Sequence, residues 1–214
     1  MQEQASALEQ AAAKVSWESY KSADSRDGRV GVYAYDRTLS TDDAAVYVNH
    51  HKNGDILIGY RGTSPRLDDL ALDAKIALGK AKSSRQVKES AATLAAVKQA
   101  YANRKVVLTG HSKGGWIAQE LAGVEHTAHV FNAAVTPEQV YRSWFEPPRK
   151  HVTYHRVEGD AVSILSPFLR GEKKTRKMKP AINVGGSAAS KKKKSFKTTV
   201  SKAIAAHALG NFIL

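Results

Sequence analysis

The sequence predicts an α/β fold in which helices cover both faces of a mixed β-sheet. Its 214 residues suit one domain with a sizeable hydrophobic core. Early in the chain, short segments rich in Val, Ile and Tyr follow one another, which is typical of a meander of antiparallel strands. Later, such segments alternate with segments of helical periodicity, which is typical of strands joined by helices.

The first half of the chain is expected to form three helices and three strands. Apolar residues recur at helical spacing from Leu8 to Val15, which predicts an amphipathic opening helix. Asn53 and Gly54 indicate a hairpin turn between two of the strands. The expected elements are a helix at 5–20, strands at 30–36, 44–50 and 55–62, and helices at 67–79 and 84–102.

In the second half of the chain, β-branched segments and helical segments alternate. Pro147 and Pro148 indicate a loop. Trp144 and Phe145, just before it, are expected in the core rather than at a membrane-dipping edge, because aromatic side chains usually bury. The expected elements are strands at 105–109, 128–133 and 151–157, and helices at 113–123, 137–144 and 199–213.

The positive charge is concentrated late in the chain. The formal net charge is +13, and the stretch from Arg170 to Lys202 contains twelve basic residues and one acidic residue. Because this stretch is rich in Lys, Ser and Gly and poor in apolar residues, we expect a flexible Lys-rich insertion at about 170–198. It is either a solvated surface segment or a contact with an anionic membrane, with nucleic acid as the alternative partner. The lysines expected to make this contact are Lys191, Lys192, Lys193 and Lys194.

The composition excludes several kinds of site. The chain has no Cys, which excludes disulfides, thiolate metal sites and a cysteine nucleophile. His50 and His51 are neighbours at the end of a predicted strand, so their side chains point to opposite faces and do not converge on one ion. We therefore expect no metal and no cofactor. The first residues show no signal peptide, and no stretch reaches the roughly 20 apolar residues of a membrane-spanning helix.

A Gly-rich motif indicates a nucleophilic serine. Residues 110–115 read Gly-His-Ser-Lys-Gly-Gly and lie directly between a predicted strand and a predicted helix. In that context the pattern G-x-S-x-G is typical of a nucleophile elbow, a turn so tight that Gly is required two positions before and after the serine. Such a turn presents the hydroxyl of Ser112 at the N-terminus of the helix. The alternative is a Gly-rich helix start without any chemistry.

The order of residues along the chain indicates which side chains would activate Ser112. In α/β hydrolases an acid and then a histidine follow the serine. Asp160 is the only Asp after Ser112, and His207 is the only His after Asp160. The hypothesis is therefore a catalytic triad of Ser112, Asp160 and His207, in which His207 is the general base and Asp160 orients it.

Four segments together resemble the class 3 lipases, a family of fungal-lipase-like α/β hydrolases. They are residues 56–73, 106–122, 156–165 and 207–212. The resemblance implies that Thr63 and the backbone N–H of Lys113 form an oxyanion hole. The family usually has Pro after the acid, whereas Ala161 follows Asp160 here. The position after the serine is commonly Leu in this family, and Lys113 at that position is a feature that resembles lipase-like proteins of bacteria, phages and large DNA viruses. The sequence does not decide the location of the protein, for which a cytoplasmic and a virus- or phage-associated location are the alternatives.

The resemblance implies one lipase-like domain over residues 1–214 with an α/β-hydrolase-like mixed sheet. The expected activity is that of a serine hydrolase that cleaves carboxylic esters of lipids, as a lipase or a phospholipase does. In such lipases a mobile segment after the oxyanion strand commonly covers the site, and it corresponds to residues 64–84 here. The alternative function is a catalytically inactive hydrolase-like module that binds anionic membrane or nucleic acid through its Lys-rich insertion.

Overall fold

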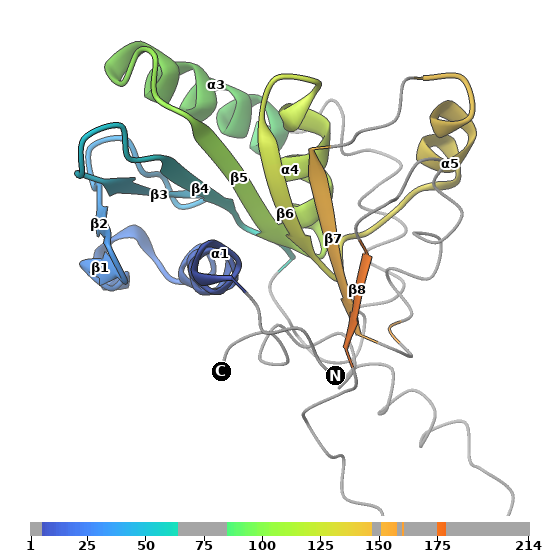
Figure 1. Cartoon of the computed structure of the whole chain (residues 1–214), viewed down its shortest axis with the longest axis horizontal. Helices are drawn as coiled ribbons and strands as arrows, with labels where there is room; N and C mark the ends of the chain where they lie inside the picture. The colour runs from blue at the N-terminus through green and yellow to red at the C-terminus, as the bar shows by residue number, and fades with distance from the viewer. Residues whose placement is uncertain (1–5, 64–84, 147–150, 158–159, 161–174, 179–214) are drawn as a thin grey trace, which may run out of the picture.

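The computed structural model describes residues 6–63, 85–146, 151–157, 160 and 175–178 of the chain (Figure 1). The helices are α1 (Ala7–Glu18), α3 (Arg85–Ala100), α4 (Lys113–Ala122) and α5 (Pro137–Ser143), with a 3-10 turn at Ala23–Ser25. The strands are β1 (Arg29–Val30), β2 (Tyr33–Tyr35), β3 (Ala44–Asn49), β4 (Ile56–Tyr60), β5 (Val106–His111), β6 (Thr127–Phe131), β7 (Val152–Val157) and β8 (Thr175–Met178).

The strands of the described residues form one mixed sheet whose spatial order follows the chain. Strands β1 to β4 pair as antiparallel neighbours, and β4 to β8 run parallel. The β3–β4 hairpin turns at Asn53, whose φ of 62° is the left-handed conformation that such tight turns need. The predicted mixed sheet and its hairpin at Asn53 and Gly54 are therefore confirmed.

Helices cover both faces of the sheet, as predicted: α3 and α4 lie on one face and α1 on the other (Figure 1). Successive side chains of a strand point to opposite faces. Ile58 therefore joins the core cluster that contains Val97 of α3 and Ile117 of α4. Leu57 joins a second core cluster, which contains Val15 of α1. The sheet thus separates two hydrophobic cores.

Helix α1 lies directly against β4 and β5. Gly59 makes this possible, because a Cβ atom there would lie only 2.7 Å from the carbonyl oxygen of Val15. Beside this contact the hydroxyl oxygens of Ser16 and Thr109 lie 2.7 Å apart, and Thr109 donates to the carbonyl of Ala12 at 3.1 Å. Hydrogen bonds between buried groups therefore fix the opening helix on the sheet.

Two predictions about strands are wrong in detail. The strand expected at 30–36 is divided at Gly31, whose φ of 56° turns the chain back so that β1 pairs with β2. Strand β8 lies inside the segment expected to be flexible at 170–198, and it pairs with β7 in parallel. The sequence of β8 contains Arg176 and Lys177, so its composition does not differ from that of the surrounding Lys-rich stretch. The Lys-rich composition therefore gave no indication of β8, which is identified by its backbone pairing with β7.

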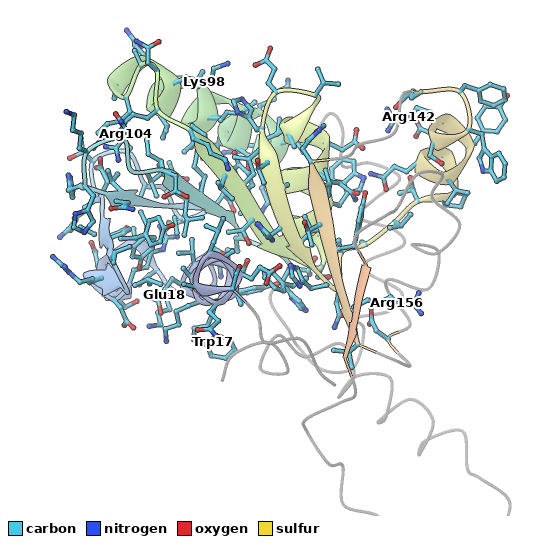
Figure 2. The ribbon with its side chains drawn as sticks, in the orientation of Figure 1. Trp17, Glu18, Lys98, Arg104, Arg142 and Arg156 are labelled. Atoms are coloured by element: carbon cyan, nitrogen blue, oxygen red, sulfur yellow. The ribbon has the colours of Figure 1, made fainter. Side chains whose placement is uncertain are left out.

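The aromatic residues at the end of α5 are exposed, although the core was expected for two of them. Trp144 is 57% exposed and Phe145 is 75% exposed. Helix α5 is attached to α4 through Arg142, which pairs with Glu120 at 3.1 Å. Figure 2 shows Arg142 on α5. This attachment fixes one side of α5 and leaves its aromatic residues in solvent.

The helices expected at 67–79 and 199–213 lie outside the described residues. The helices expected at 5–20, 84–102, 113–123 and 137–144 correspond to α1, α3, α4 and α5. Among these, none combines the length and the apolar character that crossing a membrane requires.

The close packing of α1 leads to a prediction for Gly59→Ala. The new Cβ would collide with the backbone of Val15, so α1 must move away from β4. We expect the free energy of unfolding to fall by about 1–3 kcal/mol, as overpacked cores do, measured by urea denaturation. Gly28→Ala is the control, because nothing lies within 4 Å of a Cβ atom there. Equal stability of the two variants would contradict the close contact.

Candidate active site

The carboxyl ends of the central parallel strands lie side by side at one edge of the sheet. The register pairs Tyr60 of β4 with Gly110 of β5, and His111 of β5 with Phe131 of β6. It also pairs Phe131 with His155 of β7. Residues that follow these strands therefore meet at this edge. Among them are Thr63 after β4, Ser112 after β5 and Asp160 after β7.

Ser112 forms the sharp turn between β5 and α4. Its φ of 56° and ψ of −124° are a strained conformation for a residue with a side chain, which costs about 1–3 kcal/mol. The N–H of Ser112 donates to the carbonyl of Phe131 at 3.2 Å, and the N–H of Ala134 donates to the carbonyl of Ser112 at 3.1 Å. The side chain is 2% exposed. Within the described residues its Oγ atom has no hydrogen-bond partner, so the turn presents an unpaired buried hydroxyl.

The glycines around Ser112 are required by the tightness of this turn. A Cβ atom on Gly110 would lie 2.4 Å from the carbonyl oxygen of Gly114. A Cβ atom on Gly114 would lie 2.0 Å from the carbonyl oxygen of Tyr60, at the end of β4. Both distances are far below van der Waals contact. The predicted strand–turn–helix context of the motif is therefore present, with the expected steric reason for Gly two positions before and after the serine.

Lys113 is the first residue of α4. The first N–H groups of a helix have no partner within it and carry a partial positive charge, so this end of α4 favours an anion beside Ser112. The Lys113 side chain is half-buried, and burial lowers its pKa, although the nearby carboxylate of Asp43 acts in the opposite direction. Arg61 lowers the pKa further.

Thr63 follows β4, and its hydroxyl is another buried polar group. Its Oγ1 atom has no hydrogen-bond partner among the described residues. The backbone before it is held on both sides: the N–H of Arg61 donates to the carbonyl of Asp43 at 2.9 Å, and Gln86 of α3 donates to the carbonyl of Arg61 at 2.7 Å. The segment that carries Thr63 is therefore braced at the sheet edge where Ser112 lies.

A groove with charged and apolar residues in its wall opens beside this brace, between α3 and the residues that precede β3. Its volume is about 920 Å³. Burial raises the pKa of Asp43, and a hydrogen bond to Glu89 raises it further. At Glu89 the effect is opposite: its hydrogen bond with Arg85 lowers the pKa of that carboxyl. The charged and amide side chains in its wall are Asp42, Asp43, Arg85, Gln86 and Glu89.

Tyr20, just after α1, supports the Ser112 turn from the side of the sheet that α1 covers. No role was predicted for it from the sequence. Its hydroxyl lies 2.9 Å from Nδ1 of His111, the residue before Ser112. A Cβ atom on Gly62 would lie 2.1 Å from the same hydroxyl. Burial raises the pKa of Tyr20, although Arg61 and the backbone N–H of Gly62 act to lower it. Tyr20 thus stays protonated and links α1 to the ends of β4 and β5. The long separation in sequence left no local signal of this contact.

Asp160 lies three residues after the end of β7. It is 5% exposed, and its N–H donates to the carbonyl of Val157 at 3.3 Å.

Asn132, at the end of β6, fixes the end of β7. Its Oδ1 accepts the N–H of Val157 at 2.9 Å, and its own N–H donates to the carbonyl of His155 at 2.8 Å. The φ of Asn132 is 41°, a left-handed conformation that Asn adopts more readily than most residues. Asn132 is a second supporting residue that the sequence did not reveal.

The structure brings part of the predicted site together. Thr63, Ser112, Lys113 and Asp160 lie at one edge of the sheet. His207, the lysines at 191–194 and the possible covering segment at 64–84 lie outside the described residues.

Comparisons with known proteins identify relatives of this fold. The sequence matches a family model described as a Tle-like phospholipase domain over residues 8–210. No curated protein matches it significantly. The structure of Lip2 lipase from Yarrowia lipolytica has a TM-score of 0.51 and 15% identity, with 77% of this chain and 74% of that chain covered.

Two further fungal structures are similar. The MDLA protein from Penicillium cyclopium, solved as a single-residue mutant, has a TM-score of 0.53 and 16% identity, covering 79% of this chain and 78% of that chain. The Rhizomucor miehei lipase propeptide complex has a TM-score of 0.51 and 17% identity, covering 75% of this chain and 63% of that chain. At such identities the similarity shows the fold alone, and that fold is the α/β-hydrolase-like fold of lipases. The resemblance to class 3 lipases is confirmed.

The support from α1 leads to a prediction for Tyr20→Phe. The variant loses the hydrogen bond to His111 without creating a large cavity, so the free energy of unfolding should fall by about 1–3 kcal/mol, measured by chemical denaturation. Tyr141→Phe is the matched control, because Tyr141 is 68% exposed and the same atom is removed. If both variants are as stable as the unaltered protein, the buried hydroxyl does not link α1 to the turn.

Proposed function

Because the chain belongs to the family of Tle-like phospholipase domains, we propose that it is a serine hydrolase that cleaves a carboxylic ester of a phospholipid. One observation carries the proposal: Ser112 has a strained backbone at the start of α4, and its buried hydroxyl is unpaired within the described residues. Strain of this kind persists where the surrounding structure imposes it and is concentrated at functional sites.

In this proposal His207 takes the proton of Ser112 while Oγ attacks the ester carbonyl, and Asp160 orients and stabilises the imidazolium. The spacing of the strands supports it. Ser112 follows β5 and Asp160 follows β7, with one strand between them, so the two strand ends lie about 10 Å apart. An imidazole with a hydrogen bond at each nitrogen bridges about 8 Å. A histidine therefore fits between these two side chains.

The tetrahedral intermediate would be stabilised by the N–H of Lys113 and by Thr63. The positive end of α4 favours the oxyanion that forms beside Ser112. The braced backbone of Arg61 supports a fixed position for Thr63. The acyl group is transferred to Ser112, the leaving alcohol takes the proton from His207, and water activated by the same histidine then releases the fatty acid.

The groove beside α3 would receive the polar part of the substrate. Its wall contains acidic, basic and amide side chains, which suit a hydrated head group better than an acyl chain. The Lys-rich segment would supply a separate contact with the surface of the membrane. Each basic residue near an anionic bilayer contributes about 1 kcal/mol at short range, so four consecutive lysines would concentrate the enzyme on anionic lipid.

The nucleophile is tested by Ser112→Ala. We expect hydrolysis of phospholipid and of p-nitrophenyl esters to fall by several orders of magnitude, because members of a catalytic triad act as a unit. The fold should remain intact, as followed by circular dichroism. Ser25→Ala, at an exposed serine, should keep full activity. An unaltered protein that hydrolyses no ester would instead favour the inactive binding module.

The base is tested by the pH profile. A histidine acts as a base only when neutral, so kcat/KM should fall as pH drops through the pKa of the free enzyme's imidazole, about 6.5 for an unperturbed group. His207→Ala should abolish this dependence together with most of the activity, and Asp160→Asn should reduce kcat. A rate that is constant from pH 5 to 8 would exclude His207 as the base.

The membrane contact is tested by changing Lys191, Lys192, Lys193 and Lys194 to Ser. Binding to phosphatidylglycerol vesicles at low salt should weaken strongly, while turnover of a soluble short-chain ester stays the same. Lys52→Ser with Lys105→Ser, at two exposed sites, controls for a general loss of charge. Tight binding to DNA without preference for vesicles would instead assign the segment to nucleic acid.

A further inference from the structure

A group of buried polar side chains lies between α1 and the sheet, on the face opposite α4. It consists of Glu9 of α1, His129 of β6 and His155 of β7, which are 8%, 7% and 4% exposed. Along the strands the two histidines alternate with Val130 and Tyr154, which belong to the core on the other face. Hydrophobic residues of α1 and of these strands surround the group. The proposed ester hydrolysis makes no use of it.

The three side chains converge. Nδ1 of His129 and Nε2 of His155 lie 3.2 Å apart. One potential ligand atom from each of the three residues lies within 4.8 Å of the others. The capping box of α1 holds the carboxylate in place, since Oε2 of Glu9 accepts the N–H of Ser6 at 2.8 Å. The ring of Phe131 stacks on His155 with centroids 4.6 Å apart, which restrains that imidazole.

The separation of the two imidazoles suits a hydrogen bond, and the arrangement of all three side chains also suits a transition-metal ion. Tetrahedral zinc with bonds of about 2.0–2.1 Å places its ligand atoms about 3.3 Å apart, which is the separation that the two histidines already have. The carboxylate completes the set by moving at most about 1.5 Å, within the reach of a side-chain rotation.

We propose that Glu9, His129 and His155 bind one zinc ion that fastens the first turn of α1 to β6 and β7. Two imidazoles and one carboxylate are a ligand set that zinc accepts, and imidazole ligands disfavour calcium and magnesium. The fourth position takes water or another oxygen ligand. The ion is structural in this proposal and does not touch the ester. It adds to the contacts of α1, the helix that Tyr20 directly follows and that lies beneath the Ser112 turn.

The test uses the full chain without an affinity tag, stripped of metal by a chelator and then titrated with Zn²⁺. We expect one zinc per chain by mass spectrometry of the metal after gel filtration. The melting temperature should rise by about 5–10 °C when zinc exceeds its Kd a hundredfold. Cobalt in place of zinc should give the visible absorption of a tetrahedral or five-coordinate site. Unaltered protein that takes up no zinc at micromolar concentration overturns the proposal, whatever its hydrolytic activity.

Variants locate the ion. His129→Asn and His155→Asn should each reduce zinc content at least tenfold, whereas His50→Asn, at an exposed histidine, should retain it. Glu9→Gln is the sharpest variant, because Gln preserves the capping box but removes the charge, so the fold is kept while the Kd for zinc rises at least tenfold. Zinc content that is unchanged in Glu9→Gln and in both histidine variants would place the metal elsewhere and overturn the assignment.

Discussion

The contact between α4 and the end of β4 is the constraint on which the rest of the proposed site depends. Gly114 approaches the carbonyl of Tyr60 so closely that no side chain fits between them. This approach forces the chain into the strained turn at Ser112 and brings that serine beside the segment that carries Thr63. Oxyanion stabilisation requires donors within about 2.7–3.1 Å of the developing charge. A looser packing of α4 would therefore relieve the strain but move Ser112 away from Thr63, one of its two proposed donors.

Helix α1 is the second support, and it acts from the opposite face of the sheet. Gly59 permits its close approach, and the hydroxyls of Ser16 and Thr109 join it to β5. Tyr20 then reaches His111 directly behind the serine. Figure 2 shows Trp17 pointing away from the sheet, whereas Glu18 is fully buried beside it. The buried group of Glu9, His129 and His155 lies in the same interface. Helix α1 therefore contacts β4 and β5, and also β6 and β7, the last of which precedes Asp160.

The sequence predicted what periodicity and short motifs encode. Val- and Ile-rich segments located the strands, and the Gly-x-Ser-x-Gly pattern located the turn because all the residues that form the turn lie within five positions of the chain. The contact of Gly114 with Tyr60 of β4 could not be predicted in this way. Contacts between distant residues left no such signal, which is why Tyr20, Asn132 and the Glu9 group were missed. Strand β8 was taken for part of a flexible insertion, since parallel pairing with β7 depends on backbone groups that composition does not describe. Trp144 and Phe145 were placed in the core on their apolar character, but the attachment of α5 through Arg142 leaves them exposed.

The central claim is that the strained turn makes Ser112 a nucleophile, and covalent labelling tests it most directly. The unaltered protein is treated with a serine-directed fluorophosphonate, digested and mapped by tandem mass spectrometry. The account predicts one adduct per chain, on Ser112, formed much faster at pH 8 than at pH 5 because the base must be neutral. Labelling at another serine, or none under conditions in which the fold is intact, would contradict it.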